Sequence, residues 1–203
     1  MYARVARFEG RDPNLADELI RRVREQGPGS VPDAKGFVGL FDREGGTALG
    51  ITFFESEEAI RNSEQAFEDM ARNFPEEMRG RRTSVESYEV TVVDGDPERA
   101  KAARVSTLEG SADTIDEGVE RMRSETLPKV RELEGNVGAI GLADRTSGRG
   151  IVITLWESSD ALRQSEQQAD RLREQAAEGG RQSIAGVDRY EVAVVQELSG
   201  VRA

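Results

Sequence analysis

The stretch Ile51-Thr52-Phe53-Phe54-Glu55-Ser56 returns 102 residues later as Ile153-Thr154-Leu155-Trp156-Glu157-Ser158. Each copy predicts a strand that leads into a helix, because Ser is a preferred first cap of a helix. Other matches follow in the same order along the chain: Ala3-Arg4-Val5 with Ala103-Arg104-Val105, Gly39-Leu40 with Gly141-Leu142, Ser63-Glu64-Gln65 with Ser165-Glu166-Gln167, and Tyr88-Glu89-Val90 with Tyr190-Glu191-Val192. This order indicates a tandem duplication. The offset grows from 100 to 102, so we expect two extra residues near the first helix of the second copy.

The repeat also predicts the domain organisation. Asp94-Gly95-Asp96-Pro97-Glu98 is turn-like and charged, so we place a linker at 95–101 between a first module at 1–94 and a second at 102–203. Only 36% of the 203 residues are hydrophobic and 33% are charged. One module of about 100 residues would be marginally stable alone, and packing two modules together would relieve that shortage.

Each module predicts the same order of elements. In the first copy we expect strands at 2–8, 37–43, 49–55 and 85–93, one helix that follows Asp12-Pro13, and a second helix that begins at Ser56. The order β-α-β-β-α-β is the ferredoxin-like pattern, with an antiparallel sheet and both helices on one face. The predicted class is therefore α+β, with two tandem ferredoxin-like modules.

Alternation in the third strand predicts what each face of the sheet contacts. Leu49, Ile51 and Phe53 form a purely apolar set, which we expect to face the helices. The other set mixes hydroxyl and aromatic groups, and we expect it to face the sheet of the other module: Gly50, Thr52 and Phe54, with Val152, Thr154 and Trp156 in the second copy. Sheets packed face to face would form an intrachain α/β barrel, a pseudo-dimer whose interior is a natural place for a pocket.

Composition excludes several classes of function. The formal net charge of −11 disfavours nucleic acid and anionic membrane surfaces as partners. The chain has no histidine and no cysteine, which removes the usual ligands of haem and zinc and the usual general base, so we expect neither a metal nor a cofactor. No apolar run approaches the roughly 18 residues of a membrane span, and Met1–Val5 does not resemble a signal peptide. We therefore predict a cytoplasmic protein that does not bind membranes.

Several of these stretches resemble one family. Thr154–Leu162, Gly138–Gly141 and the closing strand at Tyr190–Val192 are similar to the dimeric α/β-barrel superfamily, and within it to the antibiotic-biosynthesis-monooxygenase-like proteins. The resemblance implies a ligand cavity between each sheet and its helices. It also implies relatives that oxygenate polycyclic phenols without a cofactor, using pocket tryptophan, asparagine, arginine or tyrosine. Trp156 matches that motif, Phe54 departs from it, and the histidine of haem-handling relatives has no counterpart.

The candidate ligand-binding residues begin with the mixed face of the third strands. Trp156 with Thr154, and Phe54 with Thr52, could contact a flat aromatic ligand. The alternative, which we favour for Trp156, is an aromatic side chain that fills the core. Tyr88 and Tyr190 could donate a hydrogen bond to a ligand, but we favour strand packing for both, because both copies keep them.

Two arginines lie in the first strand of each module. Arg4 and Arg104 could hold a phenolate or a carboxylate. We favour instead a cross-strand ion pair, of Arg4 with Glu89 and of Arg104 with Glu191, worth about 0.2–1 kcal/mol.

Two hypotheses of function follow. The first is a small-molecule-binding barrel whose partner is a small aromatic ligand, with cofactor-independent monooxygenase-like activity as its enzymatic form. The alternative is a non-catalytic structural or protein-interaction module, which predicts a filled interior. The sequence does not decide whether the protein is an enzyme or whether it forms further homodimers. The presence of Trp156 makes the second half the better candidate for a ligand site.

Overall fold

The computed structural model describes residues 1–26, 30–196, 198 and 201. The chain divides into two compact units. Unit 1 contains Met1–Tyr88 and Glu191–Val201, and unit 2 contains Glu89–Tyr190. The sequence repeat and the compact units are therefore distinct divisions of the chain, because the last strand of each repeat continues into the other unit.

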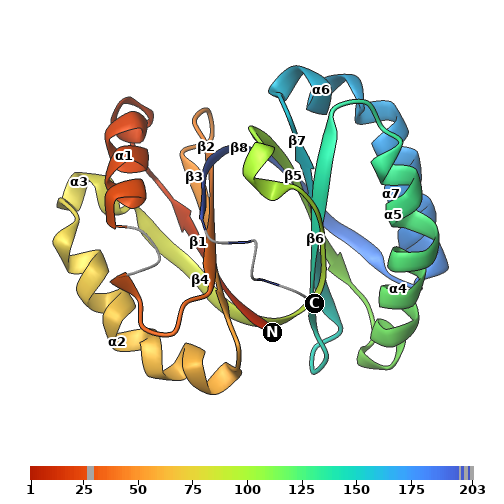
Figure 1. The fold of residues 1–203 in the computed structure, drawn as a ribbon, viewed down its shortest axis with the longest axis horizontal. Helices are drawn as coiled ribbons and strands as arrows, with labels where there is room; N and C mark the ends of the chain where they lie inside the picture. Colours follow the sequence, from red (N-terminus) through yellow and green to blue (C-terminus); the bar gives the residue numbers. More distant parts are fainter. Residues whose placement is uncertain (27–29, 197, 199–200, 202–203) are drawn as a thin grey trace. The chain divides into compact units, whose positions relative to one another are not determined.

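Unit 1 follows the predicted order of elements. These are β1 (Tyr2–Glu9), η1 (Pro13–Leu15), α1 (Ala16–Gln26), β2 (Gly36–Asp42), β3 (Thr47–Phe54), α2 (Glu57–Asn73), α3 (Glu76–Arg79) and the first part of β4 (Arg81–Gly95). Strand β3 pairs antiparallel with both β1 and β2. The end of β8 (Ser183–Gln196) pairs with β2, with Glu191 opposite Phe41. Helices α1 and α2 lie on one face of this sheet (Figure 1).

Unit 2 repeats this plan with a longer first helical region. Its elements are the end of β4, η3 (Pro97–Arg99), β5 (Ala102–Glu109), η4 (Ala112–Thr114), α4 (Ile115–Arg121), the π-helical segment η5 (Met122–Thr126), α5 (Leu127–Arg131), β6 (Asn136–Asp144), β7 (Arg149–Trp156), α6 (Ser159–Gln164), α7 (Glu166–Gly179) and the first part of β8. Strand β7 pairs with β5 and β6, and the end of β4 pairs with β6.

The hydrogen-bonded order of the strands is β1-β3-β2-β8-β5-β7-β6-β4, and it closes on itself. It closes because β4 and β8 each take part in both units. This order confirms the predicted α+β class, the tandem ferredoxin-like modules and the closed antiparallel sheet.

Local signals in the sequence place the helices as predicted. The Asp12 carboxylate accepts a hydrogen bond from the backbone of Asn14. The Ser56 and Ser158 hydroxyls each accept one from the residue three positions later, at 3.1 and 3.0 Å. These bonds satisfy backbone N–H groups that would otherwise lack a partner at a helix start.

The predicted orientation of the third strands is wrong. Phe54 packs against Ile60 and Phe67 of α2, so the mixed set faces the helices. Likewise, Trp156 packs against Ala161 and Leu162 of α6. Leu49, Ile51 and Phe53 lie on the opposite face, at 0–1% exposure. Both faces of β3 are buried, so the alternation along this strand does not distinguish the face that meets the helices.

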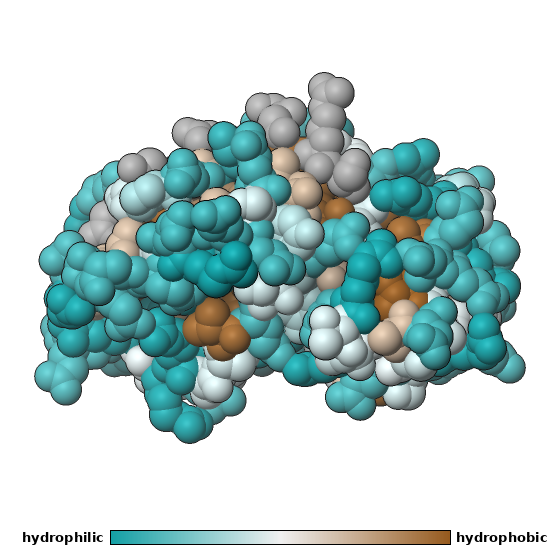
Figure 2. Space-filling model, turned by 90° about the horizontal axis from the view of Figure 1, so that it is seen from below, coloured by the Kyte–Doolittle hydropathy of each residue, from teal (hydrophilic) through white to brown (hydrophobic). Residues whose placement is uncertain are grey.

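The surface carries the charge. The face drawn in Figure 2 is mostly hydrophilic, with small, separate hydrophobic patches. Among the described residues, Val85 is the one large hydrophobic side chain that is exposed, at 39%. No helix within the described part of the chain is long and apolar enough to cross a membrane.

Candidate functional site

Unit 1 contains a cavity of about 350 Å³ between its sheet and its helices. Its floor is a row of small residues across three neighbouring strands. Ala6 of β1 lies opposite Gly50 of β3, and Gly50 lies opposite Gly39 of β2. Since none of these residues has a side chain larger than a methyl group, the sheet is hollowed at this row and the helices do not fill the space.

The walls of the unit 1 cavity are mainly apolar. The Phe37 ring lies over the floor, and carbons of this ring are 3.1 Å and 3.6 Å from where a Cβ would stand on Gly39 and Gly50. Other apolar side chains come from β1, β2, α1 and α2: Phe8, Leu19, Ile20, Val23, Phe41, Phe67, Met70 and Phe74. Such a lining favours an apolar, flat occupant.

Arg4 supplies a buried charge beside this cavity. It is 3% exposed. Its Nε and Nη2 donate to the Glu64 carboxylate at 2.8 and 3.3 Å. Its guanidinium also lies 3.9 Å from the centre of the Phe67 ring. Thr52, directly opposite Arg4 on β3, adds a hydroxyl to the lining. The cavity therefore has one polar corner that Glu64 of α2 holds in place.

Unit 2 has a counterpart cavity of about 140 Å³. The equivalent row is Ser106, Val152 and Gly141, so a branched side chain stands where unit 1 has Gly50. Trp156 lines this cavity, is fully buried, and donates from Nε1 to the Thr154 hydroxyl at 3.1 Å. Larger side chains thus occupy much of the space that is open in unit 1.

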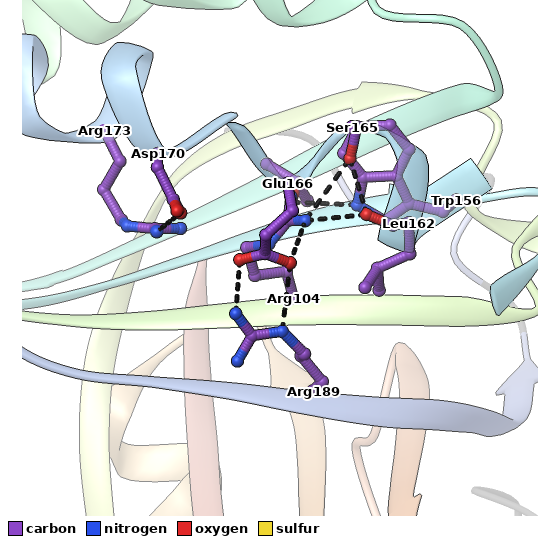
Figure 3. Close-up of polar contacts among 9 residues, drawn as sticks. Arg104, Trp156, Leu162, Ser165, Glu166, Asp170, Arg173 and Arg189 are labelled. Atoms are coloured by element: carbon purple, nitrogen blue, oxygen red, sulfur yellow. Dashed lines mark hydrogen bonds and ion pairs between the residues drawn. The ribbon is translucent and has the colours of Figure 1, made fainter. Parts of the chain in front are cut away.

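Arg104 anchors a buried polar cluster in unit 2 (Figure 3). Its Nη2 donates to the Leu162 carbonyl at 2.8 Å, to Glu166 at 2.9 Å and to the Ser165 hydroxyl at 3.3 Å. Its guanidinium lies 5.3 Å from the centre of the Trp156 ring. Burial lowers the pKa of Arg104 and outweighs the opposing effect of Glu166.

Glu166 lies between two cations, as Figure 3 shows. Arg189 of β8 donates to it from Nε at 3.1 Å, and Arg104 donates from the other side. Hydrogen bonds from Arg189, and then from Arg104, lower the pKa of Glu166 to about 2 despite the opposing effect of burial. Glu166 therefore balances the charge of Arg104, while Nε and Nη1 of Arg104 are buried without a hydrogen-bond partner among the described residues.

The predicted cross-strand pairs of Arg4 with Glu89 and of Arg104 with Glu191 are wrong. Glu89 pairs instead with Arg145, and Glu191 with Arg43 at 2.6 Å. The reason is that the ends of β4 and β8 join the other unit, which carries each glutamate away from the arginine of its own repeat.

The structure separates the other predicted residues into three groups. Arg4 and Thr52 line the unit 1 cavity, and Arg104, Thr154 and Trp156 line the unit 2 cavity. Phe54 packs in the core, edge-on to Phe67 with ring centres 6.3 Å apart. Tyr88 and Tyr190 are buried, and neither belongs to the described residues that line these two cavities.

Sequence reasoning missed three contributors to the unit 1 cavity. Glu64 could have been found, because Arg4 and Glu64 recur together as Arg104 and Glu166. The row of Ala6, Gly50 and Gly39 cannot be recognised in the sequence, because only the strand register brings these three residues together. Arg11 follows Gly10 in a polar stretch that reads as an ordinary loop, yet it lines the cavity.

Comparison with known proteins gives uncharacterized relatives in sequence and better defined neighbours in structure. No family model matches the chain. The uncharacterized protein Rv2557 of Mycobacterium tuberculosis (strain ATCC 25618 / H37Rv) is 29% identical over 178 residues, which cover 85% of this chain and 79% of that protein. The uncharacterized protein Rv2558 of the same strain is 36% identical over 75 residues, covering 37% of this chain and 32% of that protein.

Solved structures show the same fold at low sequence identity. An anthrone oxidase-like protein matches with a TM-score of 0.70 and 15% identity over 100% of this chain and 95% of that one. A ferredoxin fold protein of Listeria monocytogenes 4b F2365, described as related to antibiotic biosynthesis monooxygenases, matches at 0.54 and 13% over 94% of both chains. A heme-degrading enzyme of Listeria monocytogenes matches at 0.52 and 11%, over 93% of this chain and 99% of that one. The resemblance predicted from the sequence is thus confirmed for the fold.

Proposed function

We propose that this protein binds a small aromatic molecule in the unit 1 cavity. The observation that carries the proposal is the cavity of about 350 Å³ above a row of small residues. Ligand pockets measure about 300–1,000 Å³, and an apolar cavity of about 150 Å³ binds a single benzene ring. The unit 1 cavity therefore suits a molecule of roughly two fused rings, and the unit 2 cavity of about 140 Å³ suits at most one ring.

The lining supports an aromatic ligand with an oxygen substituent. Phe37 and Phe67 offer ring faces and edges to a flat molecule. Arg4 and Thr52 offer hydrogen-bond donors at the polar corner. We propose that the ring system lies against the floor at Gly50 and that its oxygen points toward this corner.

The test is equilibrium binding of a panel of naphthols, naphthoquinones and anthrone by dialysis or calorimetry. Gly50→Val places in unit 1 the side chain that unit 2 carries at Val152, so we expect it to weaken binding at least tenfold. The matched control is Val152→Ile, which adds one carbon to the unit 2 cavity and should leave the affinity unchanged. Binding that withstands Gly50→Val, or no binding by any compound, would contradict the proposal.

A cofactor-independent, monooxygenase-like reaction at the same cavity is a second candidate. The observation that favours it is the buried Arg4 guanidinium beside an apolar space. A nearby cation stabilises the ionised form of a phenol, and an ionised electron-rich phenol can transfer an electron to O₂. The anthrone oxidase-like neighbour is consistent with this chemistry and shares the fold alone.

Oxygen uptake separates catalysis from binding. Compounds that bind should be tested for O₂ consumption with an electrode, using Arg4→Lys and Thr52→Val as variants. Catalysis predicts uptake above the uncatalysed rate, and predicts that Arg4→Lys lowers the rate more than it lowers the affinity. Binding without uptake would leave the binding proposal intact and remove the enzymatic one.

The alternative hypothesis, a non-catalytic structural or protein-interaction module, predicts that side chains fill the interior. The unit 2 cavity fits that expectation better than the unit 1 cavity does, because Val152 and Trp156 occupy much of it. The size of the unit 1 cavity is the reason we rank binding first.

A further inference from the structure

The arginines that line the unit 1 cavity differ in how their charge is balanced. Among the described lining residues these are Arg4, Arg11, Arg79 and Arg82. Arg4 pairs with Glu64 at 2.8 Å, and Arg82 pairs with Glu68 at 2.6 Å. Arg79 of α3 donates to the carbonyl oxygens of Arg72 and Phe74 at the end of α2. Arg11 donates to the Met78 carbonyl at 2.5 Å, and no carboxylate of a described residue pairs with it.

Arg11 bears the cost of burial without compensation. Its Nε is buried and lacks a hydrogen-bond partner among the described residues. Its guanidinium lies 4.6 Å from the centre of the Phe8 ring, which also lines the cavity. Burial alone lowers the pKa of Arg11 to about 10. Buried charges are normally paired, so an uncompensated cation beside an apolar cavity indicates that its anion comes from elsewhere.

The position of Arg11 is fixed by the fold. Its backbone N–H donates to the Gly46 carbonyl at 3.0 Å. A Cβ on Gly80 would lie 2.7 Å from the Arg11 Cγ, so Gly80 leaves room for the stem of the side chain. Gly80 has a φ of +62°, which also favours glycine. The backbone and the stem of Arg11 are therefore held at this corner, and the Met78 carbonyl accepts a hydrogen bond from its guanidinium.

Unit 2 has the reverse arrangement at the same corner. The hydrogen bond that the Arg11 backbone donates to Gly46 in unit 1 has a counterpart in unit 2, where the Gly110 backbone donates to the Gly148 carbonyl at 3.1 Å. Gln182 takes the place of Gly80, and its Cγ lies 2.9 Å from where a Cβ would stand on Gly110. In unit 1 the large side chain is Arg11 and the glycine beside it is Gly80, whereas in unit 2 the large side chain is Gln182 and the glycine is Gly110. A neutral amide therefore lies where unit 1 has a cation. The charge is thus not required by the shared fold.

We propose that the ligand of the unit 1 cavity is an aromatic carboxylic acid whose carboxylate pairs with Arg11. The inference rests on the proposed binding function and names its ligand class. A carboxylate suits this corner because a guanidinium offers neighbouring N–H groups in the geometry of its two oxygens. The aromatic body would then extend from Phe8 over Gly50 toward Phe37, and an oxygen substituent on its rings would face Arg4 and Thr52.

Two ligands of the same shape test the charge. The affinities of 2-naphthoate and its neutral analogue 2-naphthamide are measured at pH 7 by calorimetry, for wild type, Arg11→Met, Arg11→Lys and Arg81→Met. Arg81 is a matched control, because it is 76% exposed, pairs with Glu9 nearby and does not line the cavity. A hydrogen bond to a charged group changes affinity by about tenfold to a hundredfold.

We expect wild type and Arg81→Met to prefer the acid by at least tenfold. Arg11→Met should abolish this preference by weakening the binding of the acid far more than that of the amide, and Arg11→Lys should retain part of the preference. Equal affinity for acid and amide in wild type, or a preference that survives Arg11→Met, would overturn the inference while the binding proposal stands. Failure of both compounds to bind, together with failure of the wider phenol and quinone panel, would overturn both.

Discussion

Units 1 and 2 share a strand frame and differ in what fills the space between sheet and helices. In the repeat, Gly50 and Phe67 of unit 1 correspond to Val152 and Ala169 of unit 2. The backbone hydrogen bond that Arg11 donates in unit 1 is donated by Gly110 in unit 2. The floor is open in unit 1, and Val152 and Trp156 close much of it in unit 2. Both units balance the buried arginine of their first strand, Arg4 with Glu64 and Arg104 with Glu166, whereas Arg11 of unit 1 pairs with no carboxylate of the described residues.

This difference indicates that, after a duplication, one copy of a fold can meet the requirements of ligand binding while the other is packed for stability. A hollow floor and an uncompensated cation both lower stability, and they are tolerated where binding requires them. The second copy, if it is free of that requirement, can be packed for stability. From the sequence, Trp156 made the second half the better candidate for a ligand site. In the structure, Trp156 is one of the residues that fill the unit 2 cavity.

The largest expected effect is on packing. Trp156→Ala should lower the free energy of unfolding by about 3–5 kcal/mol, because the ring is fully buried among Ala161, Leu162 and Ala102. Phe37→Ala should cost less than about 2 kcal/mol, because Phe37 is half-buried and borders an existing cavity. Chemical unfolding monitored by circular dichroism measures both, and equal losses would contradict the difference between the units.

The next effect concerns the buried arginine–glutamate pairs. Glu166→Gln should destabilise the protein by about 1–3 kcal/mol at pH 7, because it leaves Arg104 buried with a weaker partner. The folded-state pKa of Glu166 is depressed to about 2, so its contribution is present above pH 4.5 and is lost as the pH falls toward 2. The stability gap between wild type and the variant should therefore close over this range.

Glu64→Gln is the matched variant in unit 1. The Glu64 side chain is 46% exposed, against 30% for Glu166, so water can replace more of its interaction with arginine. We expect a smaller loss, below about 1 kcal/mol, measured by the same unfolding experiment. A larger loss of unfolding free energy for Glu64→Gln than for Glu166→Gln would contradict the expectation that the more exposed glutamate contributes less.

How much of this was predictable depends on whether a feature repeats along the chain. The repeat of Ile51–Ser56 at Ile153–Ser158 predicts the fold and its duplication, and Asp12 and Ser56 predict the helix starts. The pairing of Glu89 was not predictable, because a strand at 85–93 has the same pattern whichever unit its end joins. The predicted orientation of Thr52 and Phe54 was wrong because both faces of their strand are buried, so its alternation does not tell the helix side from the other side.

A third effect sharpens the role of Arg11. The affinity for 2-naphthoate should be constant from pH 7 to 9 and fall above a pH of about 10, where Arg11 loses its proton in the free protein. The affinity for 2-naphthamide should not follow this curve. Dialysis at each pH, with circular dichroism to verify folding, measures both. The same decline in Arg11→Met would exclude Arg11 as its cause.

The smallest effect tests the floor itself. A Cβ on Gly50 would be 3.6 Å from its nearest neighbour, the Phe37 ring, which is ordinary contact. Gly50→Ala should therefore raise stability by about 0.4–1 kcal/mol while it weakens ligand binding. A Cβ on Gly141, at the same row in unit 2, would be 2.9 Å from the Thr91 hydroxyl, so Gly141→Ala should lower stability. Thermal unfolding of the two variants, side by side, tests whether the floor has room at Gly50 and lacks it at Gly141.

The most direct measurement of the central claim is the location of a bound ligand in a crystal. Crystals would be soaked with 6-bromo-2-naphthoic acid, and the anomalous signal of bromine would mark its position. We predict one strong peak in the unit 1 cavity, near Gly50 and Phe37, with the carboxylate density at Arg11. A peak beside Trp156 in unit 2 with none in unit 1, or bromine bound only at the surface, would contradict the account.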